Sequence, residues 1–250
     1  MPLDVAEAIA LAADAPLWAE RVLDLRLDDW QADIVRAHGS QLVVTTRQGG
    51  KSTGVAIRAL HDMLFVPAAM VIAASPSEDQ SKELFRKLTG FYDRLQDPPR
   101  AVVRNTTELE LANGARCCAV PGSERTIRSK SAVTLLIIDE AARIDDGLIS
   151  GVTPMLSTTD GDLIALTTPY GRRGWFYQQW KNGGDLYLRT RVTADQCSRI
   201  SPAFLAKERA RLGPLAYGQE YECSFVEGGS SVFTDDMILA CLDRSFRPFP

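Results

Sequence analysis

The chain of 250 residues has few features of a membrane or secreted protein. Its purely apolar runs, such as Leu135–Ile138, are far shorter than the about 20 residues of a membrane-spanning helix. The first ten residues carry two acids but no lysine or arginine, unlike a secretory signal peptide. These absences predict a protein that is neither embedded in a membrane nor secreted.

Cysteine and histidine are also scarce. The five cysteines are odd in number and include no pair with C-x-x-C spacing, and only two histidines accompany them. This composition supports neither a disulfide framework nor a zinc site. We expect a reducing environment in which most of the thiols act as small buried residues.

The net charge of −4 gives no global sign of nucleic-acid binding, but the charges are unevenly spread. Residues 1–33 carry eight acids and two bases, whereas residues 171–211 carry nine bases and three acids. Such an asymmetry is typical either of a surface that faces a polyanion or of a solvated helix face. The sequence leaves both alternatives open.

Short apolar runs alternate with helical patterns between about residues 40 and 170, and no internal repeat is present. The runs predict four buried strands, at Gln41–Thr45, Met70–Ala74, Val133–Ile138 and Leu163–Thr167. The dipeptide Asn113-Gly114, between two further apolar runs, predicts a hairpin. Buried strands separated by helices indicate an α/β fold with a mostly parallel central sheet flanked by helices.

The pattern changes after Pro169. An aromatic-rich helix and a predicted strand at Leu186–Val192 are followed by two predicted helices, Pro202–Leu212 and Leu215–Tyr221. Residues 171–225 are therefore expected to form a small subdomain packed on the sheet. Glycine and serine at 228–231 have the composition of a linker.

A glycine-rich stretch at Thr45–Thr53 lies between the first predicted strand and a predicted helix. In a phosphate-binding loop, backbone N–H groups and the following helix N-terminus point at the anion. Lys51 is predicted to reach the β- and γ-phosphates, and the Ser52 hydroxyl to bind Mg²⁺. The usual motif begins with glycine, where Thr45 stands here. The nucleotide-binding residues predicted in the loop are Gln48, Gly49, Gly50, Lys51, Ser52 and Thr53.

Two acids, Asp139 and Glu140, directly follow the apolar run Leu135–Ile138. Ligands of open α/β sheets bind at the carboxyl ends of the strands, where these side chains would lie. Asp139 is predicted to join Ser52 in holding Mg²⁺. Glu140 is predicted to polarise the attacking water as general base.

Two further pairs of residues each allow two interpretations. Thr167 and Thr168 end a later predicted strand, where their hydroxyls would either sense the γ-phosphate or simply precede the proline that ends the strand. Trp30 and Gln31 would either stack on and hydrogen-bond an adenine, or belong to the packed face of an amphipathic helix. The residues alone do not decide between these alternatives.

Taken together, the motifs resemble the ATPase domain of the large terminase subunit of tailed bacteriophages, a member of the additional-strand (ASCE) P-loop NTPases with a RecA-like fold. The resemblance spans about residues 29–225. It depends on R-Q-x-G-K-S-T at Arg47–Thr53, I-I-D-E-A-A at Ile137–Ala142, T-T-P at Thr167–Pro169 and Q-E-Y-E-C-S-F at Gln219–Phe225. The family tolerates replacement of the first loop glycine and favours arginine and glutamine inside the loop.

The resemblance implies a motor domain that couples Mg-ATP hydrolysis to the movement of double-stranded DNA into a capsid. It implies adenine recognition by Trp30 and Gln31, and nucleotide sensing or positioning of the catalytic glutamate by Arg47. Thr167 and Thr168 match the motif that couples hydrolysis to movement.

Family members often carry an arginine before the acidic strand that acts in trans on the γ-phosphate of a neighbouring subunit. Arg128 occupies that place, but Ser129 follows it where the family usually has glycine. Arg125 is therefore an alternative. The resemblance thus implies that catalysis depends on Glu140, Lys51, Arg47 and this arginine.

The resemblance also implies partners: double-stranded DNA, a homo-oligomeric ring on a capsid portal, and the small terminase subunit, without a membrane. The implied location is the cytoplasm of the infected bacterial host. Candidate contacts to DNA or to a neighbouring subunit are Arg172, Arg173, Lys181, Arg189 and Arg191.

Four segments are expected on this basis: an N-terminal helical segment at 1–28, the ATPase core at 29–170, a lid subdomain at 171–225, and residues 226–250. The last segment would hold a linker and only the start of the RNase H-like nuclease domain of the family, so no DNA cleavage is expected from this chain. Two alternatives remain. A superfamily-2-type helicase would need a second RecA-like lobe, and a non-hydrolysing nucleotide-binding assembly module would have no need of Glu140.

Overall fold

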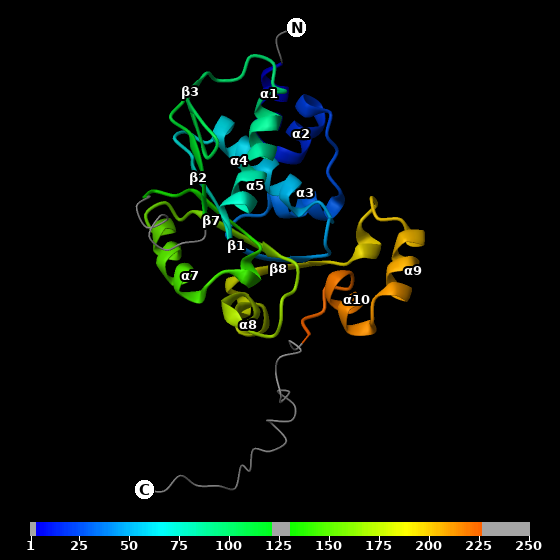
Figure 1. Cartoon of the computed structure of the whole chain (residues 1–250). Coiled ribbons are helices and arrows are strands. Elements are labelled where there is room, and N and C mark those ends of the chain that lie inside the picture. The colour runs from blue at the N-terminus through cyan, green and yellow to red at the C-terminus, as the bar shows by residue number, and fades with distance from the viewer. Residues whose placement is uncertain (1–3, 122–130, 227–250) are drawn as a thin grey trace, which may run out of the picture.

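The structure is a computed structural model that describes residues 4–121 and 131–226. Its centre is an eight-stranded sheet with the strand order β3-β4-β5-β2-β6-β7-β1-β8 (Figure 1). The strands are β1 (Ser40–Thr45), β2 (Met70–Ser75), β3 (Ala101–Arg104), β4 (Glu108–Leu111), β5 (Arg116–Pro121), β6 (Leu135–Asp139), β7 (Asp162–Thr167) and β8 (Leu188–Val192). Neighbouring strands from β5 to β8 in this order run parallel, whereas β3 with β4 and β4 with β5 pair antiparallel. The predicted α/β fold with a mostly parallel sheet is confirmed.

Helices cover both faces of the sheet. They are α1 (Val5–Ala13), α2 (Ala15–Leu23), α3 (Asp29–Arg36), α4 (Lys51–Phe65), α5 (Glu78–Tyr92), α7 (Asp146–Val152), α8 (Gly174–Asn182), α9 (Pro202–Arg211) and α10 (Pro214–Glu220). Figure 1 shows α1 to α5 on one side of the sheet and α7 and α8 on the other. No helix in the described ranges is both long and apolar enough to cross a membrane.

The side chains of the central strands point alternately to the two faces of the sheet and form two separate hydrophobic cores. On β1, Val43 packs into the core beneath α1 to α5, whereas Leu42 and Val44 pack into the core beneath α7 and α8. Successive strand side chains point to opposite faces, so a strand covered on both sides is apolar throughout. This is why the central strands are continuous apolar runs in the sequence.

The predicted hairpin at Asn113-Gly114 is confirmed, because β4 and β5 pair antiparallel around it. The amide of Asn113 donates to the Met63 carbonyl at 2.8 Å, and Gly114 takes a φ of 83°. Glycine adopts this left-handed conformation without steric cost. The turn is thereby fixed to the end of α4.

The strand predicted at Leu186–Val192 begins two residues later than expected, since Gly184–Leu186 forms a short 3-10 helix. This strand, β8, pairs in parallel with β1 from Gln41 opposite Leu188 to Thr45 opposite Val192. The segment 171–225 therefore supplies an edge strand to the central sheet. Helices α9 and α10 lie beside that edge (Figure 1).

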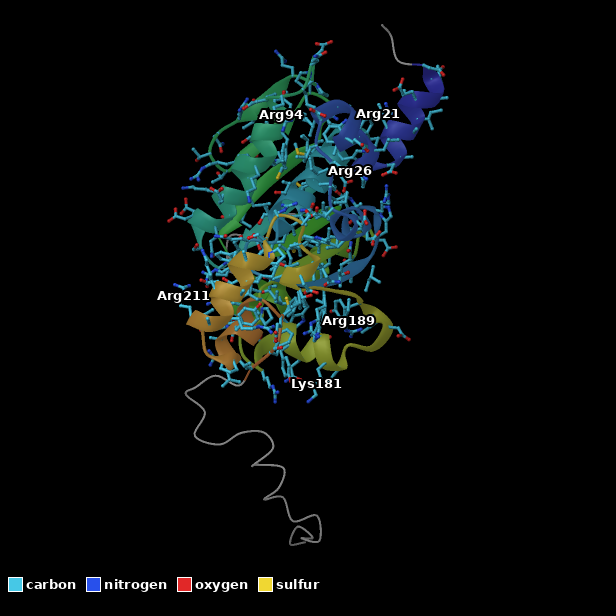
Figure 2. All side chains as sticks on the ribbon, turned by 90° about the vertical axis from the view of Figure 1, so that its right-hand side faces the viewer. Arg21, Arg26, Arg94, Lys181, Arg189 and Arg211 are labelled. Atoms are coloured by element: carbon cyan, nitrogen blue, oxygen red, sulfur yellow. The ribbon has the colours of Figure 1, made fainter. Side chains whose placement is uncertain are left out.

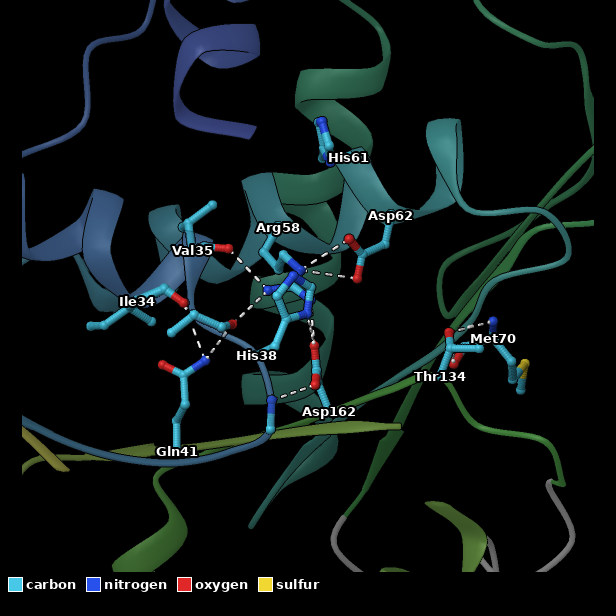
Figure 3. A network of polar contacts seen from close by, with 12 residues as sticks. Ile34, Val35, His38, Gln41, Arg58, His61, Asp62, Met70, Thr134 and Asp162 are labelled. Carbon is cyan, nitrogen blue, oxygen red and sulfur yellow. Dashed lines mark hydrogen bonds and ion pairs between the residues drawn. The ribbon is translucent and has the colours of Figure 1, made fainter. Parts of the chain in front are cut away.

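A buried ionic network lies at the amino-terminal ends of β1 and β7 (Figure 3), whereas the glycine-rich loop follows the carboxyl end of β1. Arg58, on α4, is 5% exposed and donates to Asp62 at 2.9 Å and to Asp162, at the start of β7, at 2.5 Å. It also donates to the carbonyls of Val35 and Ala37, both at 2.9 Å. One side chain thus joins α4 to the end of α3 and to the sheet.

Candidate nucleotide-binding site

The glycine-rich loop connects β1 to α4, as the sequence predicts. Gln48 and Gly50 have φ angles of 57° and 97°, and Gly50 is the N-cap of α4. These left-handed residues turn the chain sharply, so that Lys51 and Ser52 begin the helix. Four N-terminal N–H groups of a helix have no intrahelical partner and can bind an anion.

The two acids at the end of β6 lie beside this helix start. The Ser52 hydroxyl donates to Asp139 Oδ2 at 3.2 Å, and the Lys51 Nζ lies 3.5 Å from Asp139 Oδ1. The same ammonium group contacts Glu140 Oε1. Four side chains that the sequence analysis assigned to one site are therefore brought together from two separate elements.

Asp139 is a buried carboxylate that remains partnered. Burial raises its pKa above the ordinary value, while the Lys51 charge and hydrogen bonds from Ser52 Oγ and the Glu140 amide oppose that shift. Its carboxylate and the Ser52 hydroxyl are the hard oxygen donors that Mg²⁺ prefers. This donor set fits a magnesium ion held between the loop helix and β6.

The loop and the acids line an open cleft of about 670 Å³. Its lining contains the predicted residues Arg47, Gln48, Gly49, Gly50, Lys51, Ser52, Asp139, Glu140 and Thr168. It also contains five residues that no predicted motif includes, Gln80, Glu83, Leu84, Lys87 and Arg143, together with Glu220 from the motif Gln219–Phe225. The first four lie on α5, whose polar periodicity carried no motif.

Gln31 lies directly behind the loop rather than in the cleft. It is 1% exposed, its Nε2 donates to the Gly50 carbonyl at 2.8 Å, and its Oε1 accepts from the Asp28 amide at 2.9 Å. Trp30 lines a separate cleft of about 450 Å³ formed with residues 26–29 and with Gln196 and Ser198. The geometry therefore fixes Gln31 to the loop backbone and leaves Trp30 beside an open space.

Arg199 is a neighbour of the loop that local sequence gave no reason to select. Its guanidinium Nη2 lies 2.8 Å from Asp28 Oδ2, and the Ser198 hydroxyl donates to the other oxygen of that carboxylate at 2.9 Å. Residues 198 and 199 thus connect the segment after β8 to the start of α3. The contact spans some 170 residues of sequence.

Arg47 and Thr46 connect the loop to the end of α10. The Arg47 amide and the Thr46 hydroxyl donate to the Glu220 carbonyl at 3.2 and 3.0 Å. The Arg47 side chain is largely exposed, and its Nη1 lies 3.4 Å from Glu220 Oε2. The predicted nucleotide-sensing arginine therefore lies between the cleft and the 171–225 segment.

Thr167 ends β7 next to the acids, and Thr168 follows it directly. Thr167 is fully buried, and its hydroxyl donates to the Thr168 carbonyl at 2.8 Å and accepts from the Ala142 amide at 3.4 Å. Ala142 belongs to the short 3-10 helix Ala141–Arg143 that follows Glu140. A hydrogen bond therefore joins the end of β7 to the turn that carries the predicted general base.

The basic residues of 171–191 differ in their partners. The Arg189 guanidinium donates to the carbonyls of Gln179, Trp180, Gly184 and Tyr187. Arg191 donates to the Glu222 carbonyl and Arg172 to the Phe225 carbonyl. Figure 2 shows Lys181 and Arg189 at the end of the molecule opposite Arg21 and Arg94. Arg189, on β8, therefore binds the end of α8. The predicted Arg125 and Arg128 lie outside the described residues.

We predict that Gly50→Ala weakens nucleotide binding about tenfold, because the left-handed conformation costs a residue with a Cβ about 1–2 kcal/mol. The added Cβ would also clash with the Arg199 guanidinium and with the Gln31 amide. Titration calorimetry with a nonhydrolysable nucleotide measures the loss. Gly90→Ala, where an added Cβ meets no atom within 4 Å, is the matched control and should bind normally.

The double variant Gly50→Ala/Arg199→Ala separates the guanidinium clash from the other causes of this loss. It removes that clash but keeps the strained backbone and the close contact with the Gln31 amide. Binding should therefore stay weak. Recovery of affinity in the double variant would contradict the backbone explanation.

A glycine-rich loop between a parallel strand and a helix, with a lysine facing two acids at the end of the next strand but one, defines a P-loop nucleotide-binding protein. The family model described as the N-terminal part of the T4-like-virus-type terminase large subunit matches residues 42–240. The chain therefore belongs to the large terminase subunit family.

Known relatives agree with this assignment. The terminase large subunit of Thermus phage G20c is 26% identical over 241 residues, covering 79% of this chain and 48% of the relative. The large terminase ATPase domain of Thermus phage P74-26 has a TM-score of 0.73 at 19% identity, covering 83% of this chain and 97% of that domain. The large terminase of another thermophilic bacteriophage, in complex with ADP, has a TM-score of 0.62 at 13% identity, covering 80% of this chain and 53% of that one. The chain spans about half the length of its curated relatives, and its fold is that of the terminase ATPase domain.

Proposed function

We propose that this domain hydrolyses Mg-ATP and couples the hydrolysis to the movement of double-stranded DNA into a capsid. The observation that carries the proposal is the meeting of Lys51, Ser52, Asp139 and Glu140 in one cleft at the N-terminus of α4. Family membership and the ADP complex of the thermophilic bacteriophage terminase support the choice of nucleotide. Glu140 favours hydrolysis over binding alone, because a binding module does not require a base next to the phosphate site.

Each residue of the cleft has a distinct role in this proposal. Loop N–H groups cradle the phosphates, and Lys51 exchanges its contact with Glu140 for the β- and γ-phosphate oxygens. Ser52 and Asp139 hold Mg²⁺, which neutralises charge on those oxygens when it is bound. Glu140 accepts a proton from water as the water oxygen bonds to the γ-phosphorus and the bond to the β–γ bridging oxygen breaks.

The proposal assigns coupling to the contacts that leave the cleft. Arg47 senses the nucleotide next to the end of α10, and Thr167 and Thr168 transmit the loss of the γ-phosphate from the acids to β7. Trp30 and Gln31 contribute to the adenine side, with Gln31 acting through the Gly50 carbonyl. Residues 171–225 act as the lid.

We extend the proposal to the assembly in which the domain works. A homo-oligomeric ring on a capsid portal, together with the small terminase subunit, holds double-stranded DNA in the cytoplasm of the infected bacterium. Arg128, or alternatively Arg125, reaches the γ-phosphate of a neighbouring subunit. Of the basic residues of the lid, Lys181 and Arg173 are better placed for DNA or subunit contact than Arg189, whose guanidinium is occupied by four carbonyls.

The ATP hydrolysis rate per subunit, measured against protein concentration with Mg²⁺ and without DNA, tests the proposal. We expect the rate per subunit to rise with concentration and to fall by about 10³–10⁵-fold in Arg128→Ala, as for arginines supplied in trans to other NTPases. Arg125→Ala is the matched variant for the alternative arginine. A substantial rate that does not change with concentration would contradict the role in trans. ATP binding without turnover at any concentration would contradict the proposed function.

A further inference from the structure

Arg143 lies within reach of the carboxylate that the proposed function uses as general base. It ends the 3-10 helix that begins directly after Glu140, and its amide donates to the Glu140 carbonyl at 2.9 Å. Its Nε lies 3.9 Å from Glu140 Oε2, and its side chain lines the cleft. Within the described residues, Lys51 and Arg143 are the two side chains that bring a basic nitrogen to ion-pair distance of this carboxylate.

The two cations lie beside different oxygens of the Glu140 carboxylate. Lys51 contacts Oε1, whereas Arg143 faces Oε2. A P-loop lysine reaches the β- and γ-phosphates when nucleotide binds. In the proposed function Lys51 then leaves Glu140, and of these two cations only Arg143 stays beside the carboxylate.

The guanidinium of Arg143 also packs against the ring of Tyr170. The Arg143 Cζ lies 3.9 Å from the centre of the Tyr170 ring, a close cation–π contact, and the Arg173 Cζ lies 5.6 Å from the same ring. Tyr170 stands two residues after Thr168, which lines the cleft at the end of β7. Arg143 therefore touches both the turn of the acids and the segment that leads from β7 into α8.

We propose that Arg143 is a positioning residue for Glu140, and that Tyr170 holds Arg143 in place by stacking on its guanidinium. This inference rests on the proposed function, because it assumes that Glu140 is the base for ATP hydrolysis. It adds a connection between two parts of the site: when Tyr170 shifts, Arg143 shifts with it and moves the Glu140 carboxylate. A hydrogen bond from the Ala142 amide to the Thr167 hydroxyl makes a second connection between the same two segments.

Steady-state and single-turnover ATP hydrolysis, together with nucleotide affinity by calorimetry, tests the inference on wild type, Arg143→Gln, Tyr170→Phe and Tyr170→Leu. Arg143→Gln is expected to lower kcat by about 10²-fold, the loss associated with misplacing a reacting group by about 1 Å. Nucleotide affinity should stay at the wild-type value. Tyr170→Phe keeps the ring face and should retain wild-type turnover, whereas Tyr170→Leu should approach the rate of Arg143→Gln.

The double variant Arg143→Gln/Tyr170→Leu should be no slower than Arg143→Gln alone, because Tyr170 acts through Arg143. Arg104→Gln is the matched control: Arg104 also pairs with a carboxylate, Asp93, and lies 5.9 Å from the centre of a tyrosine ring, but at the far edge of the sheet. It should leave kcat unchanged.

Three outcomes would overturn the inference. Normal turnover and normal nucleotide affinity in Arg143→Gln, with wild type active and Glu140→Gln inactive, contradict the inference but not the proposed function. Weakened nucleotide affinity with unchanged kcat assigns Arg143 to substrate binding instead. Normal turnover in Glu140→Gln contradicts the proposed function and the inference together.

Discussion

Replacing Glu140 by glutamine is expected to reduce ATP turnover by about 10²–10⁴-fold, the usual contribution of a positioned general base. The amide keeps the shape of the side chain but cannot accept the proton from water. The measurement is phosphate release in single-turnover conditions, which separates the chemical step from product release. Calorimetry with ATP on the same preparation gives the affinity.

The structure also predicts the direction of the change in affinity. In the structure Lys51 contacts Glu140 Oε1, so the carboxylate competes with the nucleotide phosphates for the same ammonium group. Glutamine removes that competition, and ATP should bind at least as tightly to Glu140→Gln as to wild type. Lys51→Ala is the contrasting variant, since it should lose affinity. Loss of ATP affinity in Glu140→Gln would contradict this arrangement of the cleft.

The centre of the fold and of the site could be predicted from the sequence because the signals are local. Runs such as Leu135–Ile138 are apolar throughout because both faces of the sheet are covered. The loop residues Lys51 and Ser52 are adjacent in sequence, and Asp139 and Glu140 end a strand whose place in an open parallel sheet follows from topology. The two halves of the site meet because β1 and β6 are both central strands, separated only by β7.

The parts that could not be predicted depend on contacts between residues far apart in the chain. Arg199 pairs with Asp28, which lies 171 residues earlier in the sequence, and no periodicity marks either residue. β8 belongs to the same sheet as β1, although the composition after Pro169 suggests a separate unit. Gln31 illustrates the same limit, since its helix pattern places it on a packed face but does not say that the packed neighbour is the Gly50 carbonyl.

The contact of Arg143 with Glu140 could be predicted from the sequence, but its contact with Tyr170 could not. Arg143 stands three residues after Glu140, a spacing at which side chains of one helical turn are neighbours. Its second contact, Tyr170, follows T-T-P by one residue, and only the fold brings the two together. The sequence therefore shows Arg143 and Tyr170 each beside a motif, but it does not predict their contact with one another.

Replacing Arg58 by methionine is expected to lower the free energy of unfolding by about 3–5 kcal/mol, because removal of one partner leaves buried carboxylates without a countercharge. Arg58 is almost fully buried and serves Asp62, Asp162 and two backbone carbonyls at the end of α3. Methionine fills a similar volume, so the loss reports the charge rather than a cavity. Urea unfolding followed by circular dichroism measures it.

Arg104→Met is the matched control for this experiment. Arg104 makes two hydrogen bonds of 2.7 Å to Asp93, but both side chains are about half exposed. Exposed ion pairs contribute only about 0–1 kcal/mol. A loss of similar size in both variants would contradict the view that the buried network holds α3 and α4 on the sheet.

The cost of Arg58→Met should also depend on pH, and Asp62 gives the sign. Burial already raises the pKa of Asp62, and Arg58 opposes that shift, so the variant raises this pKa further in the folded state. A carboxyl group with a raised folded pKa binds more protons in the folded than in the unfolded chain, and stability falls as the pH rises through that range. The two other charged or titratable neighbours of Asp62 act in the same direction: the variant removes the countercharge of Asp162 as well, and it removes a charge that lowers the pKa of His61, so protonation of His61 costs the variant less. The difference in unfolding free energy between wild type and Arg58→Met should therefore be smaller at about pH 5 than at about pH 8. A difference that grows as the pH falls would show that the buried carboxylates do not carry the cost.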